Sequence, residues 1–172
     1  QENENDDNRL GADRKPGNVP EALDGGATGP ERKLYLRELI ARFGHALTLN
    51  WNLGEENTQS TEEQVAMARF IADTDPYRHL IVIHTFPEQQ DRVYDALLET
   101  PSAITGLSVQ NSWSAAHART VRWRRESARV GHPWVVCNDE QNPAGLGVPA
   151  DPGYQGYAGR NKDFISHTEY EG

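Results

Sequence analysis

Four short apolar segments follow one another along the chain, and each interval between them carries the pattern of an amphipathic helix. The segments begin at residues 46, 80, 104 and 134, so the intervals are between 24 and 34 residues long. Apolar runs of this length predict buried strands, and strands that alternate with helices at this spacing predict right-handed βαβ units on a parallel sheet. The sequence therefore predicts an α/β fold.

Local signals place the individual elements. Strands are predicted at residues 46–53 (ALTLNWNL), 80–84 (LIVIH), 104–110 (ITGLSVQ) and 134–137 (WVVC). Pro30 stands at the first position of a predicted helix that ends at Gly44. Ser60 or Thr61, each with Glu or Gln three residues later, caps the next helix, and two more are predicted from Pro87 and over residues 112–130. A barrel and a doubly wound open sheet share this alternation, so the periodicity leaves both open.

Charge argues against a nucleic-acid partner, and hydropathy argues against a membrane. The chain has 26 acidic and 17 basic residues and a formal net charge of −9, and its Lys and Arg residues are scattered among the acids. This distribution is not that of a nucleic-acid-binding surface. No apolar run approaches the roughly 20 residues that a membrane span requires. The single Cys137 forms no internal disulfide and assigns no compartment.

Polar residues follow all four predicted strands. They are Glu55 and Glu56 after the first strand, His84 at the end of the second, Gln110 and Asn111 after the third, and Asp139 and Glu140 after the fourth. Sites in parallel α/β folds form where the carboxyl ends of the strands meet. Each of these residues taken alone also fits a solvated loop start. Polar residues at four successive strand ends, with Trp51 and Trp113 close by, favour a site.

Two carboxylates on non-adjacent strands facing one cleft suit the cleavage of glycosidic bonds, in which one acts as an acid and the other as a nucleophile or base. Glu55 or Glu56 is expected to supply the first and Glu140 the second. The residues expected to orient the sugar are His84, Gln110, Asn111, Trp113, Asp139 and Asn52. Indole rings suit stacking on sugars; since Trp51 and Asn52 have opposite strand parity, only one of them faces the interior.

No sequence motif for a metal or a cofactor stands out. The chain has no HExxH motif, no paired cysteines, no phosphate loop and no dinucleotide fingerprint, so we expect no cofactor. An alternative divalent-metal site would combine His84 with Asp139 and Glu140.

Three segments, LYLRELIARFGHALTLNWNLGEEN, PYRHLIVIHTFP and PWVVCNDEQNPAGLGVP, resemble a bacterial family of clan-A-type glycoside-hydrolase-like (β/α)8 barrels. Many of its members carry a C-terminal domain described as collagen-binding. The resemblance implies a partial (β/α)8 TIM barrel whose strands four to seven lie at residues 46–53, 80–84, 104–110 and 134–138. It also implies Glu56 as the acid/base and Glu140 as the nucleophile of a retaining enzyme. Asn usually precedes the acid/base directly, whereas here Gly54 and Glu55 precede Glu56, so Glu55 competes for that role.

The expected organisation is one incomplete barrel domain over residues 1–172. Residues 1–28 and 141–172 are expected to be long loops, and residues 29–140 to form four βα units. The sequence begins without Met and stops after a polar loop, so we expect the missing strands in the full-length chain and little activity in the fragment. The expected function is a retaining O-glycoside hydrolase acting on poly- or oligosaccharides. The alternatives are a non-catalytic carbohydrate-binding barrel and a metal-dependent hydrolase.

Overall fold

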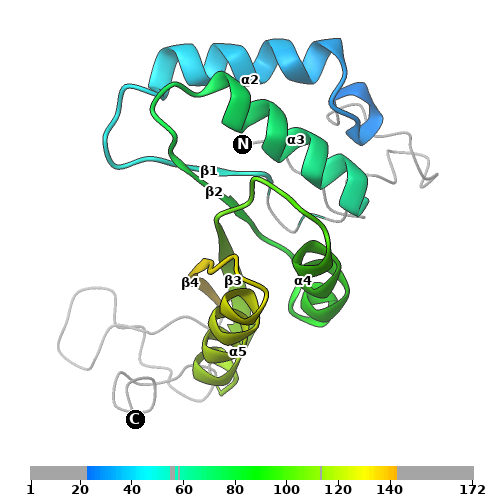
Figure 1. Ribbon diagram of the computed structural model, residues 1–172, viewed down its shortest axis with the longest axis vertical. Coiled ribbons are helices and arrows are strands. Elements are labelled where there is room, and N and C mark those ends of the chain that lie inside the picture. The colour runs from blue at the N-terminus through cyan, green and yellow to red at the C-terminus, as the bar shows by residue number, and fades with distance from the viewer. Residues whose placement is uncertain (1–22, 55–56, 58, 113, 143–172) are drawn as a thin grey trace, which may run out of the picture.

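A computed structural model describes residues 23–54, 57, 59–112 and 114–142, and shows a parallel sheet whose strands alternate with helices (Figure 1). The elements in chain order are η1 (Leu23–Gly26), α2 (Pro30–Phe43), β1 (Asn50–Asn52), α3 (Thr61–Thr74), β2 (Leu80–Ile83), η2 (Pro87–Gln89), α4 (Gln90–Glu99), β3 (Gly106–Ser112), α5 (Ala116–Arg129) and β4 (Val135–Asn142). The predicted α/β class is confirmed.

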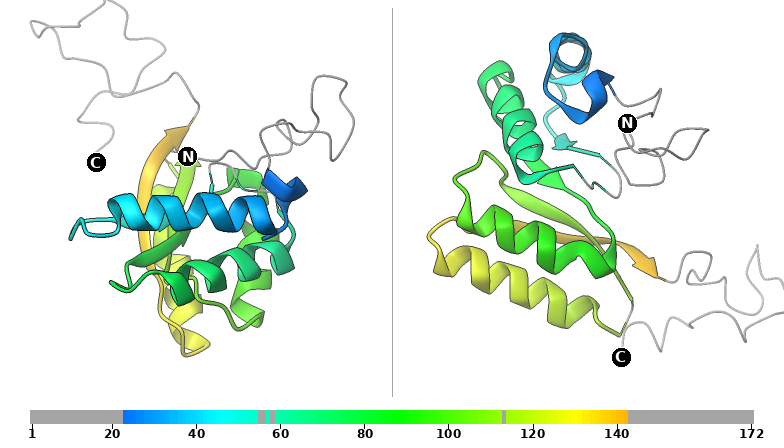
Figure 2. Two further views of the ribbon diagram at one scale, coloured as in Figure 1. Left: turned by 90° about the horizontal axis from the view of Figure 1, so that it is seen from above. Right: turned by 90° about the vertical axis from the view of Figure 1, so that its right-hand side faces the viewer.

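The strand order in the sheet follows the order in the chain. The sheet reads β1-β2-β3-β4, and all three pairings are parallel. Among these strands there is no reversal of the kind that a doubly wound sheet has at its switch point. In Figure 2, α2 runs beside α3 and α4 beside α5. Ion pairs from Arg119 and Arg122 of α5 to Asp91 of α4 join the second pair of helices.

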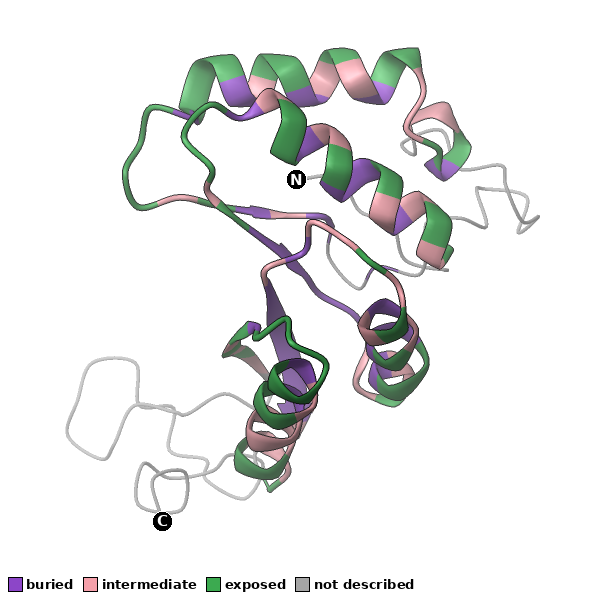
Figure 3. Cartoon of the chain, in the orientation of Figure 1, coloured by how far each residue is buried: buried purple, intermediate pink, exposed green. Residues whose placement is uncertain are grey.

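Alternate strand residues build one core with the helices. Trp51, Leu53, Ile81, Ile83 and Leu107 belong to the same buried cluster as apolar residues of α2, α3, α4 and α5. Since side chains alternate across a strand, these residues define the face that the helices cover. The buried residues in Figure 3 gather accordingly along the strands and the inner sides of the helices. The other sheet face carries the residues of opposite parity, including Asn52, His84 and Ser108.

The helix starts follow the local sequence signals. Pro30 occupies the first turn of α2, which ends at Phe43 before Gly44, as predicted. Ser60 caps α3: its side chain accepts a hydrogen bond from the Glu63 backbone, and the Glu63 carboxylate accepts one from the Ser60 backbone. The structure thus selects Ser60 over Thr61 as the cap.

Several predicted boundaries were wrong. The first strand is Asn50–Asn52 rather than 46–53, because the chain turns before it and exposes 92% of Leu47. The third and fourth strands extend to Ser112 and Asn142, since their ladder continues through seven residue pairs. The last helix consequently begins at Ala116 rather than at 112, and a 3-10 turn precedes α4.

Asp75 joins α3 to the amino ends of β1 and β2. Its carboxylate accepts hydrogen bonds from the Trp51 indole (2.9 Å), the Tyr77 backbone (3.0 Å), and the backbone (3.0 Å) and ring (2.8 Å) of His79. Burial raises the pKa of Asp75, but these hydrogen bonds, with that of Trp51 foremost, lower the pKa below its usual value. The other ring nitrogen of His79 lies 2.9 Å from the Ala46 carbonyl oxygen. Each ring nitrogen of His79 therefore lies beside an oxygen that can accept a hydrogen bond, and the ring joins the α3 end to the segment before β1.

Candidate active site

Five side chains from three neighbouring strands lie together where the strands end. His84 directly follows β2, Ser108 and Gln110 belong to β3, and Asp139 and Glu140 belong to β4. His84, Gln110, Asp139 and Glu140 were predicted site residues, and the structure brings these four together. We call the five residues the His84–Glu140 cluster.

A bulge explains how two consecutive residues of β4 reach the same cluster. Val109 pairs with Asn138 and Gln110 pairs with Glu140, so Asp139 is an extra residue in the ladder. In a regular strand Asp139 and Glu140 would point to opposite faces of the sheet. An extra residue resets this alternation, and such bulges often re-aim side chains beside active sites.

One oxygen of the Glu140 carboxylate accepts a hydrogen bond from Gln110, and the other lies near His84. The Gln110 side-chain amide donates a 2.7 Å hydrogen bond to Oε1. The His84 Nε2 atom lies 3.4 Å from Oε2, close enough for an ion pair but without a hydrogen bond. The side chain of His84 is only 6% exposed, whereas that of Glu140 is 37% exposed. Glu140 therefore offers an oriented carboxylate that a ligand can reach.

Ser108 links His84 to Asp139. The serine hydroxyl donates to the Asp139 carboxylate oxygens at 2.9 and 2.8 Å and lies 3.1 Å from Nδ1 of His84. Serine between a histidine and a carboxylate is not the order of a hydrolytic triad, in which histidine stands in the middle. The arrangement orients the imidazole and does not activate the serine.

Gln90 of α4 supports the cluster from the covered face of the sheet. Its amide nitrogen donates to the Gln110 carbonyl oxygen (2.6 Å) and to the side-chain oxygen of Asn111 (3.1 Å). Its own oxygen accepts from the Trp123 indole (3.3 Å). Asn111 also donates to Asn138 (2.8 Å). Asn111, predicted to bind substrate, is thus buried against α4, and the structure does not bring it to the His84–Glu140 cluster.

Asn57, the residue after the predicted acid/base, is anchored to the end of β2 and to the start of α3. The Asn57 backbone donates to the His84 carbonyl oxygen (2.7 Å), and the Thr85 hydroxyl donates to the Asn57 carbonyl oxygen (2.8 Å). The Asn57 side chain accepts from the amide of Gln64 (3.0 Å) and donates to that of Gln59 (2.8 Å). Glu55 and Glu56 lie outside the described residues, as does Trp113.

Side chains alternate along β1, so Trp51 and Asn52 lie on opposite faces of the sheet. Trp51 is buried in the core, with its indole nitrogen bound to Asp75. Asn52 lies on the opposite face, where its side-chain oxygen accepts a 3.3 Å hydrogen bond from the Gly54 backbone. Trp51 is therefore a packing residue, and Asn52 shares a sheet face with His84.

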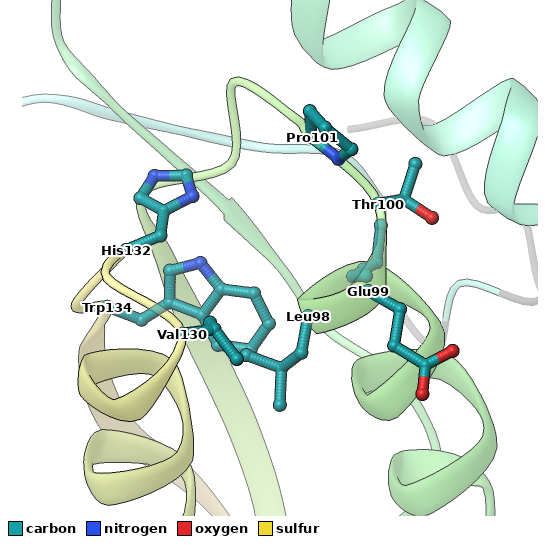
Figure 4. A pocket seen from close by; sticks show the side chains of 8 residues that line it. Leu98, Glu99, Thr100, Pro101, Val130, His132 and Trp134 are labelled. Atoms are coloured by element: carbon teal, nitrogen blue, oxygen red, sulfur yellow. The ribbon is translucent and has the colours of Figure 1, made fainter.

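Two cavities lie at the other end of the sheet. One of about 270 Å³ is lined by residues such as Leu98, Pro101, Val130 and Trp134, where α4 and α5 end (Figure 4). Another of about 310 Å³ lies beside Asp75 and residues of the β2 and β3 starts. Both cavities lie near the amino ends of the strands, whereas parallel α/β folds bind ligands at the carboxyl ends.

The described residues contain no group of three His, Cys, Asp or Glu side chains arranged to hold a metal ion. The metal-dependent alternative therefore gains no support from them. Within the same residues, no helix combines the length and apolar character needed to cross a membrane.

Sequence reasoning missed Ser108 and Gln90. Ser108 lies two residues before Gln110, so the alternation of a strand places both on one face. That parity was a usable signal. Gln90 had none, because a glutamine in the first turn of a helix is usually solvated.

Comparison of the chain with protein-family models, curated proteins and solved structures found no match. The candidate site accordingly stands on its geometry, and the resemblance to clan-A-type barrels stays a prediction.

Proposed function

We propose that this chain provides four consecutive strands and the nucleophile of a retaining O-glycoside hydrolase with a (β/α)8 barrel. The observation that carries the proposal is the Glu140 carboxylate, held by Gln110 and faced by His84 at the carboxyl end of β4. A reachable, oriented carboxylate beside a cluster of hydrogen-bonding side chains suits attack on a sugar.

The topology supports the barrel. A doubly wound sheet reverses its strand order, whereas a barrel adds strands in chain order and keeps its helices outside. The order β1-β2-β3-β4 and the core that these strands share with α2, α3, α4 and α5 fit the second arrangement. The proposal assigns β1 to β4 as strands four to seven and expects strands one to three and eight in the full-length protein.

The roles of the carboxylates follow from this assignment. The hydrogen bond from Gln110 orients the carboxylate of Glu140, which attacks the anomeric carbon. Glu56, or Glu55 in its place, protonates the leaving oxygen and then activates the water that releases the sugar. Retention of configuration requires the two carboxyl groups to lie about 5 Å apart.

The first experiment replaces Glu140 by Gln in the full-length protein and compares it with Glu88→Gln. Glu88 is an exposed carboxylate in η2, at the same end of the sheet. The assay follows release of 4-nitrophenol from α- and β-glycosides of common hexoses and pentoses, and of reducing ends from polysaccharides. We expect Glu140→Gln to lose about 1,000-fold or more in kcat/KM and Glu88→Gln to keep full activity.

Glu55→Gln and Glu56→Gln identify the acid/base. A 2,4-dinitrophenyl leaving group needs no proton, so the variant of the true acid keeps much of its kcat/KM on that substrate, while its kcat falls because release of the sugar slows. On a sugar leaving group the same variant loses kcat/KM as well. Hydrolysis retained by Glu140→Gln contradicts the assignment. Binding of sugars by the wild-type protein without any bond cleavage favours a carbohydrate-binding barrel.

A further inference from the structure

Asp139 is an exposed carboxylate of the His84–Glu140 cluster that a ligand can reach. The bulge in β4 places it beside Glu140, on the sheet face that the helices leave uncovered. Its two oxygens accept hydrogen bonds from the Ser108 hydroxyl at 2.9 and 2.8 Å, and no other side chain of the described residues is bonded to them. A carboxylate has about four acceptor sites, whereas Ser108 supplies one proton. Asp139 is therefore held in place and keeps most of its accepting capacity for a ligand.

His84 gives independent evidence that a polar ligand completes the cluster. Its side chain is only 6% exposed, and its Nε2 atom faces the Glu140 carboxylate at 3.4 Å. This atom is buried and has no hydrogen-bond partner among the described residues. Buried polar atoms in native proteins are nearly always paired, so an unpaired one indicates a missing partner. A ligand hydroxyl can supply that partner whichever ring nitrogen carries the hydrogen, because a hydroxyl both donates and accepts.

The charges of the cluster decide which polar ligands suit it. Asp139 and Glu140 are consecutive carboxylates, and the β3 side chains between them and His84 are uncharged. Among the residues that the structure describes, no Lys or Arg side chain pairs with either carboxylate. A ligand carboxylate would therefore meet repulsion that no neighbouring cation offsets. Ligand hydroxyls would instead donate charge-assisted hydrogen bonds, which are stronger than bonds between neutral groups.

We propose that Asp139 determines the substrate class: it accepts hydrogen bonds from the hydroxyls of an uncharged sugar and excludes sugars that carry a carboxylate, such as hexuronic acids. Neighbouring hydroxyls of a sugar ring can donate to the two oxygens of one carboxylate. A hexose and its uronic acid differ only in the oxidation of one carbon, so Asp139 separates them by charge and not by ring shape. The inference rests on the proposed function and specifies the substrates of the same site.

The test compares matched substrates of the full-length protein: 4-nitrophenyl glucosides and galactosides against the corresponding glucuronides and galacturonides. We expect the wild-type protein to cleave the neutral substrates faster, and Asp139→Asn to narrow this ratio of kcat/KM values by about tenfold, as for one charge pair roughly 6 Å apart at an effective dielectric constant of about 40. A general loss of folding or catalysis cancels in the ratio. Glu88→Gln removes another exposed carboxylate at the same end of the sheet and should leave the ratio unchanged.

Ionic strength gives a second readout that needs no variant. Because Asp139 is exposed, salt screens its repulsion of a glycuronide. Raising sodium chloride from about 20 to about 500 mM should therefore narrow the preference of the wild-type protein for neutral substrates. The same change should affect the ratio less in Asp139→Asn, which has lost the charge. A wild-type preference that does not respond to salt would show that shape, and not charge, excludes the acidic sugar.

Binding separates failure of this inference from failure of the proposed function. Saturation-transfer NMR with methyl glucoside, methyl galactoside and their uronic acids measures binding without cleavage. If the neutral sugars bind in preference, Asp139→Asn weakens that preference and nothing is cleaved, the proposed function fails and the inference stands. If cleavage requires Glu140 but glycuronides are cleaved as fast as glycosides, or Asp139→Asn leaves the ratio unchanged, the inference fails and the function stands. Neither binding nor cleavage of any neutral sugar overturns both.

Discussion

The Nε2 atom of His84 and the Oε2 atom of Glu140 lie 3.4 Å apart, although β3 separates their two strands in the sheet. The bulge at Asp139 directs Glu140 toward the histidine, and Ser108 and Gln110 of β3 fill the space between. The candidate site thus depends on the register of three strands, and on the packing that holds this register.

The cap of α3 gives a test of local structure. Ser60→Ala removes the acceptor of the Glu63 backbone N–H and should lower the free energy of unfolding by about 1 kcal/mol. Thr61→Ala should be neutral or slightly stabilising, because Thr61 is the first helical residue and alanine favours a helix. Urea unfolding of both variants checks the difference; an equal loss in the two contradicts the assigned cap.

Gln90 gives a test of the support behind the cluster. Gln90→Ala leaves the Trp123 indole and the Gln110 carbonyl oxygen buried without this partner and should destabilise the fold by about 2–4 kcal/mol. The neighbouring Gln89→Ala loses only an exposed contact with Arg92 and should cost less than about 0.5 kcal/mol. Thermal unfolding followed by circular dichroism compares the two. Similar melting temperatures would show that Gln90 contributes no such support.

The Asp75 cluster predicts how stability depends on pH. Because the folded-state pKa of Asp75 is lowered, its contribution is complete above the unfolded-state value of about 3.8 and is lost as pH falls through the lower folded-state pKa. Asp75→Asn should cost about 2–4 kcal/mol at neutral pH and flatten the acid limb of the stability curve. Asp73→Asn, which loses an exposed pair with Arg69, should cost less than about 1 kcal/mol. Urea unfolding between pH 2 and 7 measures the free energy of unfolding of both variants. If the acid limb of Asp75→Asn matched that of the wild type, ionisation of Asp75 would not contribute to stability.

Tyr94 separates ring packing from hydrogen bonding. Among the described residues its hydroxyl is buried without a hydrogen-bond partner of good geometry, while its ring packs edge-on against Trp123 at 5.1 Å. Tyr94→Phe should change the free energy of unfolding by less than about 0.5 kcal/mol, and Tyr94→Ala should lower it by about 3–5 kcal/mol. If Tyr94→Phe cost well over about 1 kcal/mol in chemical denaturation, the hydroxyl would have to be bonded.

The sequence predicted those features that depend on neighbouring residues. Pro30, Ser60 and Gly44 mark helix ends through local backbone chemistry, and the position of His84 at the end of an apolar run placed it at the carboxyl edge of the sheet. Strand–helix alternation was enough to predict the parallel sheet, since parallel strands need such crossovers.

Features that depend on register escaped prediction. Nothing in the segment around Asp139 signals the bulge, because a bulge arises from pairing with β3 and not from local propensity. Asn111 follows Gln110 directly, yet alternation sends it to the covered face, where Gln90 binds it. The contact between Ser108 and Asp139 likewise requires knowing which strands are neighbours.

The most direct test of the account is to trap the covalent intermediate on the full-length protein. The probe is the 2,4-dinitrophenyl 2-deoxy-2-fluoroglycoside of the sugar that the protein hydrolyses fastest, since fluorine slows breakdown of the glycosyl-enzyme. We predict that intact-protein mass spectrometry shows one added fluorosugar and that peptide mapping places it on Glu140. Glu140→Gln should abolish the labelling, whereas Glu88→Gln should leave it unchanged. Labelling of Asp139, Glu55 or Glu56 instead, or hydrolysis with inversion and no adduct, would contradict the assignment of Glu140 as the nucleophile.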